Sequence, residues 1–346
     1  MRGLLNSYGI ENIYILGAGF SRPLGLPLTS ELFGLVYDIA KSKEWFDDGK
    51  PVKFGQAEWL LEEMQYYYPT LNITHENFKT QTLNIDIEEF LSLVSTSSFF
   101  IENTSEKWDN HGSKFNSWLK KWIAEAIYNQ QLESDLNPSS ILDHFVQSLD
   151  KSIIITFNWD TMLEQAMDRN NIEYSYQLDN GIINHKTPIL KLHGSIDWFL
   201  PRECDYKKLG KRYFIDTGER FKKYVSDLTD CYSEHMTPYI VTPNFEKISQ
   251  LKEFGNLWTM PWALFQNKID VKIIGFSMRN DDFHTRAFIY PQLFIGSKSN
   301  DIIIRVLDYA TELIKEDELR AKFKGIENIE FNFGGFNLGT LEWILK

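Results

Sequence analysis

The chain has 346 residues, of which 43% are hydrophobic and 15% aromatic, and this composition excludes a disordered or low-complexity protein. Its 36 Lys and Arg stand against 48 Asp and Glu, so the formal net charge is −12. Nucleic acid binding rests on clustered positive charge, so this balance argues against nucleic acid as the main ligand, although a local basic groove stays open. The length suits one large domain or two modest ones.

The N-terminal region does not resemble a secretory signal. The apolar stretch at 13–20 follows Glu11, lacks a basic leader and is short for a signal core. No stretch of the sequence reaches the roughly 18 apolar residues that a membrane helix needs. We therefore expect a cytoplasmic protein without a membrane-spanning segment.

The first predicted element is a strand at Ile13–Leu16, a short apolar run that favours burial on both faces. It stops at Gly17-Ala18-Gly19-Phe20-Ser21, and a helical pattern follows from about residue 31 to residue 40. Glycines after a first strand let the backbone approach a pyrophosphate. The third glycine of the dinucleotide fingerprint is missing, so a simple tight turn remains the alternative.

Residues 41–150 show a different texture, in which apolar side chains recur at helical spacing between polar loops. Trp118, Trp122, Ile123 and Ile127 are one such series. We interpret this segment as a mostly helical insertion within a single domain that spans residues 1–346.

Strand-like apolar runs return after residue 150 and alternate with amphipathic segments. The predicted strands are 153–156, 189–192, 239–241, 271–274 and 302–306, and the amphipathic segments are 249–266, 282–293 and 308–323. This alternation predicts an α/β fold, a doubly wound and mostly parallel Rossmann-like sheet. Ligands bind such sheets at the carboxyl ends of the strands, where the motifs of this chain occur.

Thr156-Phe157-Asn158-Trp159-Asp160 stands at the end of the second predicted strand. An Asn and an Asp two positions apart can both face a ligand where the backbone turns. The alternative is that Asn158 or Asp160 caps the helix that follows.

His193 follows the strand at 189–192 and precedes Gly194. A histidine titrates near neutral pH, so it is suited to act as a general base. A lone histidine is more often structural, and the chain has seven. Its place at a strand end distinguishes it, and there we expect both Asn158 and His193 to face the crevice.

A further small-residue turn, Gly275-Phe276-Ser277, follows the strand at 271–274. It is suited to cradle a ribose or phosphate. The alternative is a strand-to-helix turn in which the acidic residues at 281–282 cap the next helix.

Taken in order, these segments resemble the sirtuin superfamily, and in particular its bacterial sirtuin-like branch of NAD-consuming proteins associated with antiphage defence. The glycine segment is similar to the family's first NAD-binding motif, Thr156 to Asp160 to its threonine-x-asparagine-x-aspartate motif, and His193-Gly194 to its catalytic histidine-glycine. Gly275 to Ser277 resembles its glycine-x-serine ribose site.

The resemblance implies cleavage of the nicotinamide–ribose bond of NAD+, which gives nicotinamide and ADP-ribose or a cyclised relative. It assigns Asn158 to positioning a water or the ribose, Asp160 to the carboxamide of the leaving nicotinamide, and His193 to the attacking group. The remaining residues that it implies for phosphate and ribose binding are Gly17, Ala18, Gly19, Phe20, Ser21, Thr156, Gly275 and Ser277. Asp308, after the strand at 302–306, is a further candidate for the adenosine ribose.

Two features depart from the deacetylating sirtuins. Their zinc module needs four cysteines, whereas this chain has only Cys204 and Cys231, so we expect no structural zinc. Their proline-aspartate-phenylalanine-arginine stretch is also absent, since Leu28-Thr29-Ser30 follows Gly25-Leu26-Pro27. A protein deacylase, an ADP-ribosyltransferase and a non-catalytic nucleotide sensor remain the alternatives.

Constant NAD+ depletion would be toxic, so the resemblance implies a gated enzyme. It suggests gating by homo-oligomerisation or by a separate protein, such as a translocase ATPase or an Argonaute-type protein. The sequence leaves no room for a sensor domain beside the catalytic fold and the insertion, so we expect sensing to lie in another chain.

Overall fold

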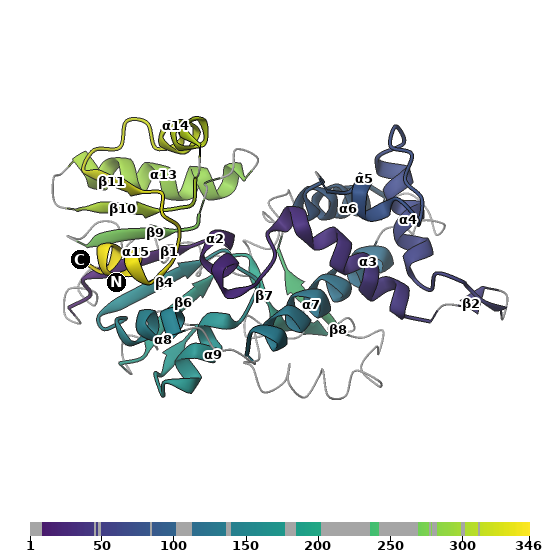
Figure 1. Cartoon of the computed structure of the whole chain (residues 1–346), viewed down its shortest axis with the longest axis horizontal. Coiled ribbons are helices and arrows are strands. Elements are labelled where there is room, and N and C mark those ends of the chain that lie inside the picture. Colours follow the sequence, from purple (N-terminus) through teal and green to yellow (C-terminus); the bar gives the residue numbers. More distant parts are fainter. Residues whose placement is uncertain are drawn as a thin grey trace. The chain divides into compact units, whose positions relative to one another are not determined.

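The protein is described by a computed structural model, in which contacts divide the chain into two compact units (Figure 1). The first unit comprises residues 1–26, 134–194 and 249–346, and the second comprises 27–133 and 195–248. Within these units the structure describes residues 9–44, 46–47, 50–83, 85–101, 113–135, 140–176, 185–201, 236–241, 269–276, 278, 282–298, 302–310 and 312–346.

The first unit is built on a seven-stranded sheet with the strand order β11-β10-β9-β1-β4-β6-β5. All of its paired strands are parallel. The strands are β1 (Asn12–Leu16), β4 (Ser152–Thr156), β5 (Tyr174–Ser175), β6 (Thr187–Lys191), β9 (Asp270–Ile274), β10 (Ile304–Leu307) and β11 (Ile329–Asn332). Because the chain adds strands first on the β4 side of β1 and later on its β9 side, the switch point of the sheet lies at β1.

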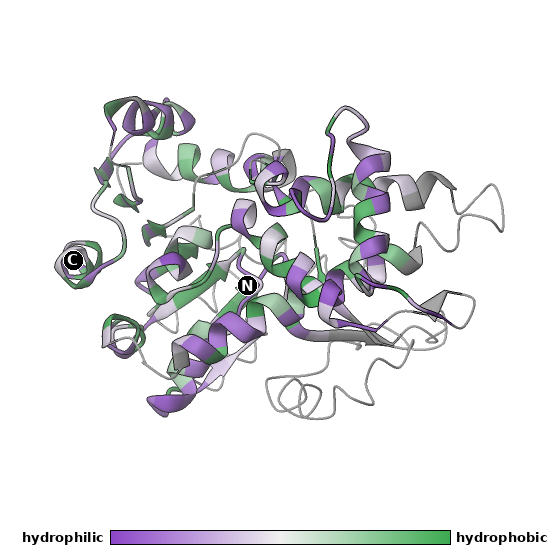
Figure 2. Cartoon of the chain, turned by 45° about the vertical axis from the view of Figure 1, so that its right-hand side comes forward, coloured by the Kyte–Doolittle hydropathy of each residue, from purple (hydrophilic) through white to green (hydrophobic). Residues whose placement is uncertain are grey.

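Both faces of this sheet are covered, because successive side chains of the central strands point to opposite faces. On one face, Ile13, Ile15, Ile153 and Ile155 pack with apolar residues of the helix α13 (Phe283–Lys298) and with Phe323 and Ile326, which follow α14 (Leu313–Lys322). The central strands therefore carry apolar side chains on both faces, at residues 13–16 and 153–155, and Figure 2 shows green along these strands. Such continuous runs are typical of parallel strands buried on two sides.

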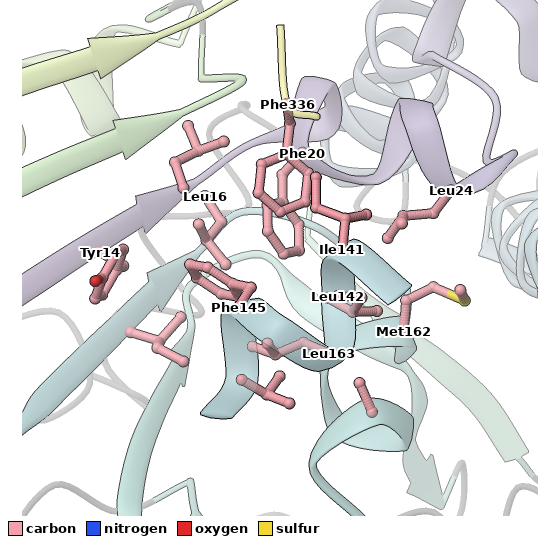
Figure 3. Close-up of a cluster of buried hydrophobic side chains, with 14 of the residues drawn as sticks. Tyr14, Leu16, Phe20, Leu24, Ile141, Leu142, Phe145, Met162, Leu163 and Phe336 are labelled. Atoms are coloured by element: carbon pink, nitrogen blue, oxygen red, sulfur yellow. The ribbon is translucent and has the colours of Figure 1, made fainter. Parts of the chain in front are cut away.

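On the opposite face, Tyr14, Leu16 and Ile154 pack against α8 (Ser140–Gln147), α9 (Met162–Arg169) and α15 (Leu338–Leu345). Figure 3 shows this cluster, with Phe20 lying among Phe145 and Phe336. The α/β fold class predicted from the sequence is confirmed: it is a Rossmann-like parallel sheet with helices on both sides.

The second unit is mainly helical and has its own aromatic core. Its helices are α3 (Leu32–Ser42), α4 (Ala57–Tyr67), α5 (Phe78–Gln81), α6 (Ile87–Ile101) and α7 (Ser113–Asp135). Phe33 packs on Phe90 with ring centroids 5.4 Å apart, and Trp59 packs on Phe115 at 5.3 Å. A small hairpin of β2 (Phe46–Asp47) and β3 (Lys50–Pro51) precedes α4. The interpretation of residues 1–346 as a single domain with an insertion stays a prediction.

One predicted strand has a different place from the one expected. Residues 239–241 overlap β8 (Met236–Ile240), which pairs with β7 (Gly194–Pro201) in a separate two-stranded sheet and does not join the parallel one. Gly194, the first residue of β7, is separated from β6 by Leu192 and His193, and its left-handed backbone (φ +76°) allows the turn between the two strands. The amphipathic segment 249–266 lies outside the described residues. None of the helices that the structure describes has the length and apolar character to cross a bilayer.

Candidate active site

The loops that follow β1, β4, β6 and β9 meet at the carboxyl edge of the parallel sheet in the first unit. The loop after β1 contacts the loop after β4 through Asn158. The ring of Phe157, after β4, packs on the ring of His193 with centroids 4.9 Å apart and stacks on the ring of Phe276 with centroids 4.6 Å apart. The structure thus brings together four motifs that are far apart in the sequence.

The loops after β1 and β9 cross with their backbones in direct contact, and this leaves no room for a Cβ at Gly17, Gly19 or Gly275. A Cβ on Gly17 would lie 2.5 Å from the carbonyl oxygen of Gly275, and one on Gly275 would lie 2.2 Å from the carbonyl carbon of Gly19. The amides of Gly17 and Gly19 donate to the carbonyls of Ile274 and Gly275, both at 3.0 Å. These two N–H groups, expected from the sequence to face a phosphate, therefore join the two loops to each other.

We expect Gly275→Ala to lower the melting temperature by considerably more than Gly9→Ala. Both glycines have left-handed backbones, with φ values of +59° and +64°, so alanine is strained at either position. A Cβ on Gly9 meets nothing within 4 Å, whereas a Cβ on Gly275 overlaps the backbone of Gly19 and Phe20. Thermal unfolding of the two variants separates the loop crossing from backbone strain, and equal losses would contradict a tight crossing.

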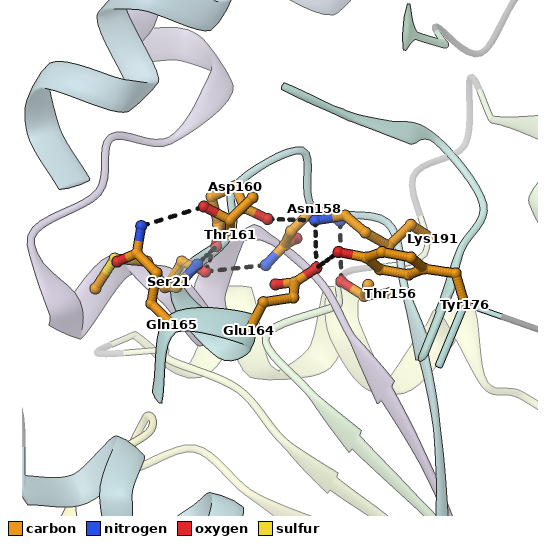
Figure 4. Close-up of polar contacts among 10 residues, drawn as sticks. Ser21, Thr156, Asn158, Asp160, Thr161, Glu164, Gln165, Tyr176 and Lys191 are labelled. Carbon is orange, nitrogen blue, oxygen red and sulfur yellow. Dashed lines mark hydrogen bonds and ion pairs between the residues drawn. The ribbon is translucent and has the colours of Figure 1, made fainter. Parts of the chain in front are cut away.

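Asn158 bridges the first two loops and does not cap a helix. Its Nδ2 donates to the carbonyl oxygen of Gly17 at 2.9 Å and to Oγ of Ser21 at 3.1 Å, while its backbone N–H donates to Oγ1 of Thr156 at 3.1 Å. Figure 4 shows this side chain among Ser21, Asp160 and Thr156. The capping alternative is therefore wrong for Asn158.

Asp160 combines a capping role with a contact to the first loop. Its Oδ1 accepts from the backbone N–H of Met162 at 3.1 Å, at the start of α9, and its Oδ2 accepts from the Ser21 hydroxyl at 2.8 Å. Burial raises the pKa of the Asp160 carboxyl, and the charge of Lys191 and the Ser21 hydroxyl oppose this rise. A carboxyl with a raised pKa is closer to the neutral form that can donate a hydrogen bond to an amide.

A buried ion pair holds the loop after β4 in place. Lys191, at the end of β6, lies 2.9 Å from Oε1 of Glu164 on α9, and their side chains are 1% and 5% exposed. The Lys191 ammonium also donates to the backbone carbonyl of Asp160, and the Tyr176 hydroxyl donates to Glu164 at 3.3 Å. Lys191 therefore fixes the position of the Asp160 backbone relative to β6.

His193 lies deeper in the protein than the sequence predicts. It is only 4% exposed, whereas a crevice-facing side chain was expected from its position after a strand. Its Nε2 lies 3.3 Å from Oδ2 of Asp282, the residue before α13. Asp282 also accepts from the backbone N–H of Thr285 at 3.0 Å, so the alternative interpretation of residues 281–282 as a helix cap is confirmed at Asp282.

The other predicted binding residues differ in what they present to a ligand. Ala18 begins α2 (Ala18–Ser21), a single helical turn, and the side chain of Phe20 lies in the core, 1% exposed. Ser277 lies outside the described residues. At the end of β10, Asp308 accepts from the backbone N–H of Tyr309 at 2.8 Å through Oδ1. Its Oδ2 is buried and receives no hydrogen bond from the part of the chain that the structure describes.

Two residues near the loops, Lys191 and Glu164, had no role assigned from the sequence, and Asp282 was considered there only as a helix cap. Lys191 carried a signal, because a charged residue inside an apolar strand needs a buried partner. Glu164 looked like an ordinary first-turn residue of a helix, and Asp282 like an ordinary N-cap. The contact of Glu164 with Lys191 and that of Asp282 with His193 join segments distant in the sequence, so no local pattern predicts them.

Metal ligation finds no support among the residues that the structure describes, which contain no group of three or more His, Cys, Asp and Glu side chains placed to hold an ion. Cys204 and Cys231 lie outside those residues. The absence of a structural zinc therefore stays a prediction.

A family model matches the part of the chain that contains the loops after β4, β6 and β9. The model of the SIR2-like domain matches residues 152–289, which begin at β4 and end within α13. The match contains Asn158, Asp160, His193 and Asp282, and it supports a sirtuin-like family. SIR2-like domains are often NAD-using enzymes, so the match indicates an NAD-related activity. No curated protein matches the chain.

Proposed function

We propose that the chain hydrolyses NAD+ at the nicotinamide–ribose bond to give nicotinamide and ADP-ribose. The observation that carries this proposal is the convergence of Asn158, Asp160 and His193 at one end of the parallel sheet, beside its switch point. Asn158 and Asp160 contact the loop after β1, and His193 packs on Phe157, whose ring stacks on Phe276 in the loop after β9. Open α/β sheets bind their ligands at such points.

The residues fit the demands of the reaction. The carbon–nitrogen bond breaks through an oxocarbenium-like transition state, the bonding electrons pass to the pyridine nitrogen, and water adds to the freed carbon. His193 takes the proton that the water loses, and Asn158 orients the water or the ribose. Asp160, whose carboxyl pKa is raised by burial, donates to or accepts from the carboxamide of the leaving nicotinamide.

Asp308 fits the adenosine ribose. Its Oδ2 is a buried acceptor that has no donor among the described residues, next to the turn at Gly275, whose N–H donates to the Leu307 carbonyl. A buried acceptor without a donor is costly, and a ribose hydroxyl would satisfy it. Oδ2 of Asp308 would thus accept from the ribose the hydrogen bond that the described residues do not supply.

We expect Asp308→Asn to raise the melting temperature at pH 7 and by less at pH 4, while raising KM for NAD+. Burial raises the pKa of the Asp308 carboxyl, so folding favours its protonated form. Below about pH 4, the ordinary pKa of an aspartate in the unfolded chain, the protonated acid contributes its full stability. This stability is lost as the pH rises from there through the raised pKa of the folded protein. The neutral amide avoids this loss. An unchanged KM would contradict a role in binding the ribose.

The wider role that we propose is a gated effector of bacterial antiphage defence that acts by depleting NAD+. It rests on the sirtuin-like motifs, and it requires a restraint on activity, either by a homo-oligomer or by a partner of the translocase ATPase or Argonaute type. Full NAD+ cleavage by the isolated, monomeric chain would argue against such a restraint.

Incubation of the purified chain with NAD+ alone, and then with NAD+ and an acetylated peptide, tests the proposed reaction. We expect nicotinamide and ADP-ribose to form without the peptide, as measured by liquid chromatography. Turnover that needs the peptide would instead indicate a deacylase or an ADP-ribosyltransferase. Tight binding of NAD+ without turnover, measured by calorimetry, would indicate a nucleotide sensor.

A further inference from the structure

We propose that Asp282 is a positioning residue for His193: its carboxylate holds the imidazole with the proton on Nε2, so that Nδ1 is the nitrogen that takes up a proton in the reaction. This inference rests on the proposed NAD+ cleavage and names the residue that prepares its base. The observation is the distance of 3.3 Å between Nε2 of His193 and Oδ2 of Asp282.

The chemistry of the two groups fixes the direction of this contact. A carboxylate accepts hydrogen bonds and donates none, so the imidazole nitrogen that faces it carries the proton. In a neutral imidazole the other nitrogen, Nδ1, then holds the lone pair. When Nδ1 takes a proton from the attacking water, the carboxylate stabilises the imidazolium that forms.

Both partners are buried, and this strengthens the contact. Their side chains are 5% and 8% exposed, so water competes little with the carboxylate for Nε2. The distance is long for an N–H···O hydrogen bond, but bonds of this kind are often loose in the free enzyme and tighten in the complex with substrate.

Each partner is also held by its surroundings. The Asp282 carboxylate accepts from both the backbone N–H and the hydroxyl of Thr285, which fixes it at the start of α13. The His193 ring makes a T-shaped contact with the ring of Phe157 at an interplanar angle of 70°, and Phe157 stacks in turn on Phe276. A rigid carboxylate and a packed ring give the imidazole one orientation.

Capping of α13 is the competing explanation, because an N-cap needs no histidine. Asp282→Asn separates the two roles, since asparagine caps helices as well as aspartate does. The variant keeps the cap and the size of the side chain, and it removes only the charge and the obligatory acceptor.

We expect His193→Gln to lower kcat by about a hundred- to ten-thousandfold, the range of general base catalysis. Asp282→Asn should lower kcat by at least about tenfold and by no more than His193→Gln does. KM for NAD+ and the melting temperature should stay close to those of the wild type. Nitrogen-15 NMR of the labelled protein should show His193 as the Nε2–H tautomer in the wild type, with its signal assigned by its absence in His193→Gln. The variant should lose this fixed tautomer.

Asn337→Ala is the control for cap loss, because the Asn337 side chain accepts from the amides of Gly339 and Thr340 at the start of α15. It should lower the melting temperature and leave kcat unchanged. If Asp282→Asn keeps both kcat and the Nε2–H tautomer, the positioning role is wrong and NAD+ cleavage still stands. If the wild type does not cleave NAD+, the proposed function fails, and the tautomers of the wild type and Asp282→Asn alone decide the role of Asp282.

Discussion

Asn158→Ala is expected to lower NAD+ cleavage by about a hundred- to a thousandfold, the usual effect of removing one positioned hydrogen-bonding group from a reacting centre. The side chain lies between the loops after β1 and β4, within reach of Ser21 and the Gly17 carbonyl. Its loss removes a polar group from the point where those loops meet. Nicotinamide release, measured at saturating NAD+, checks this expectation.

Asn158 also holds two loops together, so its structural part needs a control. Each of its two hydrogen bonds contributes about 1 kcal/mol to stability, and their loss should lower the melting temperature modestly. Ser134→Ala removes another hydrogen bond to the segment after β1, from the Ser134 hydroxyl to the Leu24 carbonyl. We expect that control to lose stability and keep activity. An Asn158→Ala protein that still cleaves NAD+ at a comparable rate would show that the residue only joins the loops.

Lys191→Met is expected to be the most destabilising single change, with a loss of about 3–5 kcal/mol in the free energy of unfolding. It leaves the Glu164 carboxylate buried without its cation, because the pair is nearly inaccessible to water. It also frees the Asp160 carbonyl from its charged donor. Urea denaturation measures the loss.

The double variant Lys191→Met/Glu164→Leu should recover much of that stability, since replacing a whole buried pair with apolar side chains is often neutral or favourable. The exposed pair of Lys151 and Glu11 is the matched control, with side chains 49% and 62% exposed. Glu11→Gln should leave the denaturation midpoint where it is. A comparable loss in Glu11→Gln and Lys191→Met would mean that burial does not set the strength of the Lys191 pair.

The sheet and its carboxyl edge were predictable because the signal is local. Short apolar runs such as 13–16 and 153–156 indicate strands buried on both faces, and the polar motifs directly follow them in the sequence. Parallel strands align their carboxyl ends, so motifs after separate strands had to meet. This reasoning located Asn158 and His193 without knowledge of the strand order.

Contacts between distant segments were not predictable in the same way. Asp282 has the sequence pattern of an N-cap, and nothing in its neighbourhood indicates the second contact to His193. The glycines at 17, 19 and 275 suggested a phosphate cradle, but their spacing does not show that two loops cross. The pairing of β8 with β7 was missed because an apolar run does not identify its partner strand.

The position of β1 at the centre of the sheet affects how the chain folds during synthesis. Asn12 pairs on one side with Ser152 and on the other with Asp270, so β1 leaves the ribosome well before the strand that covers its second edge. Until β9 has emerged, one edge of β1 has none of its native hydrogen bonds, and its apolar side chains lack their final neighbours. Exposed strand edges and apolar surface of this kind favour aggregation and binding by chaperones. The carboxyl edge of the sheet, where the loops after β1 and β9 cross, therefore forms only after most of the protein has been made, and shortened chains that stop before β9 lack the loop after β9.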